Sequence, residues 1–253
     1  MGLSWTVLGG SPAWPNPGQA ASGYVLEAGG QRVLVDCGSG IAAELRAHDP
    51  GPLDAIVITH FHADHWFDLV PLHYAYLFGS WNERKHPRLH LAPGGRDVLD
   101  RVATSWGGRL STFEAAFETD EFDPDGELVI GPMRLTFAPC QHYTPCWSVR
   151  IDHNGSTLVY SADTGPTQQL IEFARGADLF VCEAALASAE RDDDDRGHMD
   201  PDEAGTAAAA AGVGSLLLTH VPAENDLGRV LERARAHFAG PVDIARPGLR
   251  LDI

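Results

Sequence analysis

Residues 60–65 read His60-Phe61-His62-Ala63-Asp64-His65, and they follow directly on an apolar, β-branched run at residues 54–59. Such a run predicts a buried strand that ends just before His60. Three imidazoles and a carboxylate within six residues at a strand end are not core filling, because buried polar groups need partners. Imidazole nitrogen and carboxylate oxygen suit zinc and related divalent ions. The stretch therefore predicts a metal site, whereas a chance polar loop is a poor explanation of this spacing.

The spacing within this stretch predicts more than one metal. In an extended segment His60 and His62 point the same way, because side chains alternate along the chain. The turn that follows brings Asp64 and His65 to a neighbouring position. One segment is therefore expected to supply ligands to two adjacent ions.

Three further strand ends carry residues of the same chemical types. His142 follows an apolar strand, Asp163 follows the strand ending Tyr-Ser-Ala, and His220 follows Leu-Leu-Leu-Thr. Taken alone, His142 is equally explained as a loop residue, and Asp163 as a turn aspartate before Gly165. Open α/β sheets build their sites at the carboxyl ends of strands, and this favours a shared site.

Hydrophobic periodicity and turn residues indicate an α/β fold with two strand-rich stretches, each followed by helix and strand alternation. Strands are predicted at residues 3–8, 23–28, 32–36, 54–59, 128–130, 133–138, 147–152, 156–160, 178–182, 215–219, 242–244 and 249–252. Helices are predicted at residues 66–78, 96–105, 167–175 and 226–238, with another from the capping sequence Asp200-Pro201-Asp202-Glu203 to Gly212. The pattern suggests two sheets packed face to face with helices outside, and no linker separates two cores.

The stretch at residues 60–65 resembles the HxHxDH signature of the metallo-β-lactamase superfamily, and the later elements follow in the expected order. The resemblance implies a four-layer αββα sandwich, formed by a single domain over residues 1–253. It implies two divalent metal ions, zinc first, with manganese and iron as alternatives. Carried over by position, the first metal would bind His60, His62 and His142, the second would bind Asp64, His65 and His220, and Asp163 would bridge both.

A second element resembles the ribonuclease-Z-like phosphodiesterases. Gly197-His198-Met199-Asp200 precedes a helix, and Cys182-Glu183-Ala184 ends a strand. The resemblance implies that His198 is a general acid that Glu183 orients. The alternative is an ordinary loop histidine after the acidic run at residues 192–195. Asp64 and Asp36 are expected to contact metal-bound water or to support the ligands, whereas Asp68 is expected to be a surface carboxylate.

Charge and loop length bear on the substrate. The net charge is −17, and only 20 residues separate His142 from Asp163, where ribonuclease Z carries a long tRNA-gripping arm. Both observations argue against a nucleic-acid partner and for a small phosphodiester. The chain also resembles the small cyclic-nucleotide phosphodiesterases of this superfamily, for example in Ala21-Ser22-Gly23-Tyr24, and this resemblance implies a cyclic nucleotide as the substrate. The implied reaction is attack by a metal-bridging hydroxide, with His198 protonating the leaving oxygen. The alternatives are a thioester, lactone or β-lactam hydrolase, a ribonuclease-Z-type RNA endonuclease, and a metal-dependent binding protein without activity.

The remaining features concern location, assembly and aromatic residues. The sequence shows no signal peptide and no bilayer-length apolar run, and its four cysteines lack metal-site spacing, so a cytoplasmic protein without a membrane partner is expected. A homodimer is left open. Tyr143 and Trp147, which flank His142, are expected in the substrate pocket. Core packing is expected for most of an aromatic cluster at Trp66, Phe67, Tyr74, Tyr76, Phe78 and Trp81.

Overall fold

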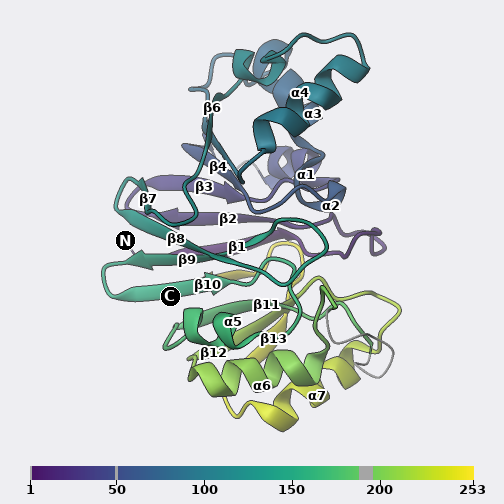
Figure 1. The fold of residues 1–253 in the computed structure, drawn as a ribbon, viewed down its shortest axis with the longest axis vertical. Helices are drawn as coiled ribbons and strands as arrows, with labels where there is room; N and C mark the ends of the chain where they lie inside the picture. The colour runs from purple at the N-terminus through teal and green to yellow at the C-terminus, as the bar shows by residue number, and fades with distance from the viewer. Residues whose placement is uncertain (1, 49–50, 188–195) are drawn as a thin grey trace.

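Two seven-stranded sheets form the centre of the computed structural model, which describes residues 2–48, 51–187 and 196–253 (Figure 1). The first sheet has the order β14 (Arg250–Asp252), β1 (Ser4–Gly9), β2 (Gly23–Ala28), β3 (Gln31–Val35), β4 (Ala55–Ile58), β5 (Arg88–Leu91) and β6 (Glu118–Glu121). The second sheet has the order β13 (Val242–Ile244), β12 (Ser215–Thr219), β11 (Leu179–Glu183), β10 (Ser156–Tyr160), β9 (Trp147–His153), β8 (Met133–Pro139) and β7 (Leu128–Ile130).

Each sheet is antiparallel in one half and parallel in the other. In the first sheet β3, β4, β5 and β6 run parallel, and in the second β10, β11, β12 and β13 do. The predicted β9–β10 hairpin is confirmed, and its turn residues Asn154 and Gly155 have the positive φ values that a tight hairpin turn needs. The carboxyl ends of neighbouring parallel strands meet at one edge, and there the sheets deliver their polar residues.

Within the described ranges, seven helices and one 3₁₀ turn accompany the sheets. They are α1 (Ile41–His48), α2 (Ala63–Trp66), α3 (Leu69–Phe78), α4 (Gly95–Ser105), η1 (Thr112–Ala115), α5 (Gln168–Phe173), α6 (Pro201–Ala211) and α7 (Leu227–His237). Figure 1 shows α1, α3 and α4 over the outer side of the first sheet, and α5, α6 and α7 over that of the second. One apolar core lies between the sheets and one lies under each helix layer. The four-layer αββα sandwich is therefore confirmed.

Local sequence signals predict the ends of α6 correctly. The Asp200 carboxylate accepts hydrogen bonds from the backbone N–H groups of Asp202 and Glu203, and the Glu203 side chain accepts from the Asp200 N–H, which completes the capping box. Gly212 ends the helix with a φ of 64°. The acidic run at residues 192–195 lies outside the described residues.

The prediction of one helix over residues 66–78 is wrong in detail. The chain forms the short helix α2, which already includes Asp64 and His65, and then α3, with Asp68 between them as the residue preceding α3. The half-buried Asp68 carboxylate accepts hydrogen bonds from the N–H groups of Gly40 and Ala42, both at 2.9 Å. It therefore caps α1, a helix that the sequence pattern did not predict.

The aromatic cluster divides between core and surface. Trp66, Tyr76 and Trp81 are buried, as expected, but three others are exposed, at Phe67, Tyr74 and Phe78. The expectation that most of the cluster packs in the core is therefore wrong for half of its members. In the described part of the chain, no helix combines the length and the apolar character needed to cross a bilayer.

Gly38 permits the close approach of α2 to the end of β3. A Cβ at this position would lie 1.8 Å from the carbonyl oxygen of Asp64. We expect Gly38→Ala to lower the free energy of unfolding at the upper end of the roughly 1–3 kcal/mol that overpacking costs, measured by urea denaturation. Gly228→Ala is the matched control, because its nearest neighbour is a side-chain oxygen at 3.2 Å. Equal stability of the two variants would contradict this account of Gly38.

Candidate metal centre

The residues expected to bind metal come from both sheets and meet at one edge of the sandwich. His60 follows β4, and His62, Asp64 and His65 lie at or in α2. His142 lies between β8 and β9, Asp163 follows β10, and His220 follows β12. The backbone of His60 pairs with that of Cys146, which joins the β4 end to the loop that carries His142. All seven side chains fall into two groups of potential ligands, the same two that the family resemblance implied.

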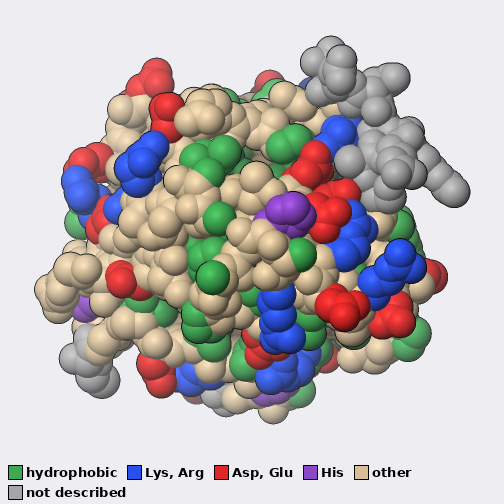
Figure 2. Space-filling view, turned by 90° about the horizontal axis from the view of Figure 1, so that it is seen from below, with side chains coloured by type: hydrophobic (Ala, Val, Ile, Leu, Met, Phe, Trp, Pro, Cys, Tyr) green, Lys and Arg blue, Asp and Glu red, His purple; other side chains and the backbone are tan. Residues whose placement is uncertain are grey.

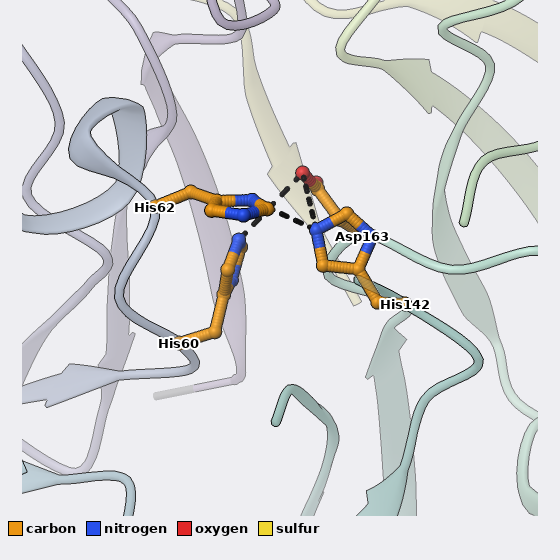
Figure 3. Close-up of side chains that lie close together, drawn as sticks. All are labelled: His60, His62, His142 and Asp163. Carbon is orange, nitrogen blue, oxygen red and sulfur yellow. Dashed lines mark hydrogen bonds and ion pairs between the residues drawn. The ribbon is translucent and has the colours of Figure 1, made fainter. Parts of the chain in front are cut away.

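The first group contains three histidines and Asp163 (Figure 3). The Nε2 atoms of His60 and His142 lie 3.7 and 3.8 Å from the same carboxylate oxygen, Oδ2 of Asp163. Nδ1 of His62 lies 2.9 Å from Nε2 of His142. Figure 3 shows the three rings and the carboxylate turned toward a common centre.

The second group uses the same carboxylate. Nε2 of His220 lies 3.0 Å from Oδ2 of Asp64 and 3.7 Å from Oδ2 of Asp163. Nε2 of His65 lies 3.4 Å from Oδ2 of Asp64 and 3.3 Å from Oδ1 of Asp163. Asp163 therefore belongs to both groups and can bridge two cations.

The hydrogen bonds show which ring nitrogens of the two groups keep a lone pair for a metal ion. Nδ1 of His142 lies 2.8 Å from the carbonyl oxygen of Gly197, which can only accept, so Nδ1 carries the proton of the neutral ring and Nε2 carries a lone pair. Nε2 of His60, Nε2 of His65 and Oδ1 of Asp163 are buried and make no hydrogen bond of good geometry to any described residue. Such unsatisfied polar atoms are rare in protein interiors. Divalent cations would satisfy them, so the residues fit a metal centre.

The protonation states agree with this reading. Burial lowers the pKa of His60 and of His62, and it lowers the pKa of His142 to about 4, so these rings are neutral at neutral pH. Burial alone would raise the pKa of Asp163, but His220 and His65 hold it well below its usual range. The first group thus offers neutral imidazoles and an ionised carboxylate, which are the forms that bind metal. In the second group, burial alone would lower the pKa of His65, but Asp163 and Asp36 raise it well above its usual value, so a cation there would displace a proton.

Asp36 is the expected supporting residue, and the structure places it behind His65. Its buried carboxylate accepts hydrogen bonds from Nδ1 of His65 at 2.8 Å and from the Tyr160 hydroxyl at 3.1 Å. It also accepts from the N–H and the hydroxyl of Thr59. This arrangement fixes the His65 ring with Nε2 toward Asp163, as carboxylate partners of metal-binding histidines do.

Backbone strain is concentrated around the centre. Asp36, Ala162 and His220 have φ values of 59°, 50° and 58°, in the left-handed region that non-glycine residues rarely adopt. Each follows the carboxyl end of a strand, namely β3, β10 and β12. Such conformations cost on the order of 1–3 kcal/mol each and cluster at functional sites. Here they turn the chain sharply where a strand delivers its polar side chain.

His198 and Glu183 lie against both groups of potential ligands. Nδ1 of His198 lies 2.8 Å from Oε1 of Glu183. The His198 ring stacks on the ring of His220 at 5.6 Å between centroids and meets the His142 ring edge-on at 5.0 Å. Glu183 also accepts hydrogen bonds from backbone N–H groups of Thr164, Ala185 and Met199. Its oxygens are already engaged, so Glu183 is better suited to orient His198 than to bind a metal.

Gln141 is a site residue that sequence reasoning missed. Its N–H donates to the Thr164 hydroxyl, its carbonyl accepts from the Gly165 N–H, and its amide nitrogen donates to the Arg196 carbonyl. These bonds join the loop of His142 to the segments that carry the shared carboxylate and the expected acid. The only sign of this role in the sequence was the position of Gln141 next to His142, because its contacts span up to 55 residues.

Of the two expected pocket aromatics, only one lies at the centre. Tyr143 is 65% exposed, and its ring lies 5.2 Å from that of His142 and 5.8 Å from that of His198. Trp147 packs edge-on against Phe122 and lines a separate hollow with Phe173. Trp147 begins β9 and packs against the apolar core between the sheets.

Comparison with known proteins agrees with this geometry. Residues 31–221 match the family described as "Beta-lactamase superfamily domain". The chain belongs to the metallo-β-lactamase superfamily. It is 33% identical over 244 residues to the probable metallo-hydrolase YhfI of Bacillus subtilis, covering 96% of this chain and 97% of that protein. The crystal structure of B. subtilis YhfI matches with a TM-score of 0.89, 31% identity and full coverage of both chains.

A second relative is ribonuclease Z of Mycobacterium bovis, 28% identical over 282 residues, covering 99% of this chain and 98% of that protein. The family and the histidine–aspartate groups together identify this superfamily member as a metal-dependent hydrolase that uses divalent ions.

Removal of the shared carboxylate tests the centre directly. We expect Asp163→Asn to hold fewer than half of the metal ions that the unaltered protein holds, because both groups lose a charged ligand. Elemental analysis by mass spectrometry of protein purified without chelator measures this. His48→Ala is the control, because His48 is an exposed histidine of α1. Full metal content in Asp163→Asn would rule out a bridging role.

Proposed function

We propose that the protein hydrolyses a small phosphodiester, with cyclic nucleotides as the substrate class. The observation that carries this proposal is the Glu183–His198 pair, which lies against both groups of potential metal ligands. A phosphodiester needs a proton for its leaving alkoxide, and a histidine at this position supplies one. Thioesters, lactones and β-lactams have no phosphate for His198 to face.

The ligands are assigned as the family resemblance implies. One ion would be held by His60, His62 and His142, the other by Asp64, His65 and His220, and Asp163 would contribute to both. Two bound divalent ions, zinc in the first instance, would lower the pKa of water and neutralise charge on the phosphate. Asp36 keeps His65 in its binding orientation, and Asp64 lies where it can also contact a water at the second ion.

The protonation of His198 supports its role as general acid. Burial alone would lower its pKa, but the hydrogen bond and the charge of Glu183 raise it to about 9. His198 is therefore protonated at neutral pH. Because Nδ1–H donates to Glu183, the Nε2 proton is the one available to the leaving 3′-oxygen of a cyclic nucleotide.

The shape and charge of the chain support a small substrate. The 20 residues between His142 and Asp163 are largely taken up by the β9–β10 hairpin. The match to ribonuclease Z extends over 282 residues, more than the 253 of this chain, so the relative has insertions. The net charge of −17 disfavours long polyanions such as RNA. The described cysteines are free thiols, which supports a cytoplasmic location.

Replacement of His198 separates the acid role from metal binding. We expect His198→Ala to lower kcat on a cyclic nucleotide by roughly 10²–10⁴-fold with metal content unchanged. A nitrophenyl phosphodiester should lose far less activity, because its leaving group hardly needs a proton. His237→Ala, at the exposed end of α7, is the control. Equal losses on both esters would exclude the general-acid role.

A substrate panel tests the proposed class. The purified metal-loaded protein is assayed on cyclic nucleotides, a short RNA, a thioester, an acyl lactone and a chromogenic β-lactam. Preference for the cyclic nucleotides supports the proposal. Preference for RNA would indicate an endonuclease, and turnover restricted to acyl substrates would overturn the phosphodiesterase assignment altogether.

A further inference from the structure

Opposite charges lie beside one another on the surface around α6 and α7. Figure 2 shows acidic and basic side chains next to each other on this face, and Arg233 of α7 donates hydrogen bonds to Asp200 and Asp202. Charges that are paired in this way leave little free charge for a ligand. Two side chains of a different chemistry, the thiols of Cys140 and Cys146, lie beside the metal centre and have no part in the proposed reaction.

Cys140 and Cys146 lie directly opposite each other at the end of the β8–β9 ladder. The last listed pair of the two strands is Pro139 with Trp147, so the next pair along is Cys140 with Cys146. The Cys140 N–H donates to the Cys146 carbonyl oxygen at 2.9 Å, which continues the ladder by one step. Directly opposite side chains of an antiparallel pair lie on the same face of the sheet. The two thiols are accordingly in hydrogen-bond contact with each other.

This geometry suits a disulfide. Opposite residues of a hydrogen-bonded antiparallel pair have Cα atoms about 5.5 Å apart. Disulfides span Cα separations of roughly 4.4–6.8 Å, most often about 5.5–6 Å. Both cysteines are free thiols in the structure, and they need little backbone movement to form an S–S bond.

The cysteine pair closes the loop that carries His142. Only residues 141–145 lie between the two cysteines, so a bond between their sulfur atoms would turn this loop into a small ring. The backbone of Cys146 also pairs with that of His60, and its sulfur is in hydrogen-bond contact with the backbone N–H of Asp163. Three potential ligands of the first group are therefore connected to the pair through the backbone.

We propose that Cys140 and Cys146 form an oxidation site, at which a peroxide produces a reversible disulfide that weakens metal binding by the first group. In a reducing cytoplasm the pair stays as two thiols. Formation of the bond moves the sulfur atoms from non-bonded contact to bonding distance, and the backbone transmits this movement to His60 and His142. Metal–ligand distances in proteins vary by only about 0.2 Å, so a small shift of two ligands matters. The inference holds for any substrate of the metal centre.

The oxidation balances in two steps. Cys140 is only partly buried and is the sulfur that a peroxide reaches first, whereas Cys146 is 2% exposed. The Cys140 sulfur takes one oxygen atom as the O–O bond of hydrogen peroxide breaks, which gives a sulfenic acid and water. The Cys146 sulfur then attacks the sulfenic sulfur, and the displaced hydroxide leaves as water with the thiol proton. Two thiols are thereby oxidised to one disulfide while one peroxide is reduced.

Peptide mapping of the metal-loaded protein tests the pairing. After treatment with hydrogen peroxide and alkylation of the remaining thiols, chymotrypsin cuts after Tyr143 and so separates the two cysteines. We expect the two fragments to stay joined and to separate after reduction with a phosphine. Cys182→Ala is the matched control, because Cys182 is a buried thiol of the core beneath α6 and its loss should leave the linkage intact. Fragments that are not joined, with Cys140 unmodified or oxidised to a sulfinic acid, would overturn the pairing.

Competition with a chromogenic metal chelator measures the consequence for the metal. The disulfide-linked protein should bind its metal roughly tenfold or more weakly than the reduced protein, as changes behind a metal ligand usually do. Reduction with a phosphine, followed by metal reloading, should restore the affinity. Cys140→Ala and Cys146→Ala should show the same affinity before and after peroxide, because neither variant can form the bond. Equal affinities of the reduced and disulfide-linked proteins would overturn the proposal, and so would a peroxide-induced loss of affinity in Cys140→Ala.

Discussion

The buried carboxylate of Asp163 imposes the main constraint on this structure. It is 2% exposed, it faces histidines of two groups, and its Oδ1 has no hydrogen-bond partner among the described residues. An ionised group in such surroundings costs several kcal/mol unless a counter-charge accompanies it. The imidazoles of His60, His62 and His142 are neutral and cannot supply that charge, whereas bound cations would. The arrangement therefore fits a metal centre.

The rest of the sandwich is organised to bring these groups together. Both sheets end their parallel strands at the same edge, and left-handed residues after β3, β10 and β12 turn the chain there. Behind this edge, Asp36 binds His65, Thr59 and Tyr160 from three different elements. The strain is tolerated because the two apolar cores beneath the helices and the one between the sheets hold the strands in register.

The proposed general acid, His198, is held by groups from one half of the sandwich. The loop at residues 196–200, which carries His198, is held in place by Gln141 and by the capped start of α6. Both belong to the second sheet and its helices.

Taken alone, the sequence determined the ligand types, most strands, the β9–β10 hairpin and both ends of α6, since these depend on alternation and on contacts within a few residues. It also predicted which seven residues converge. Strand ends can be located from the local sequence, and the resemblance to the family supplied the grouping of the ligands. Only tertiary structure decided that Asp68 caps α1 and that Gln141 joins three loops. The acidic edge strand β6 and the exposed face of α3 could not be predicted from the sequence either, because strand pairing and burial depend on residues that are distant in the chain.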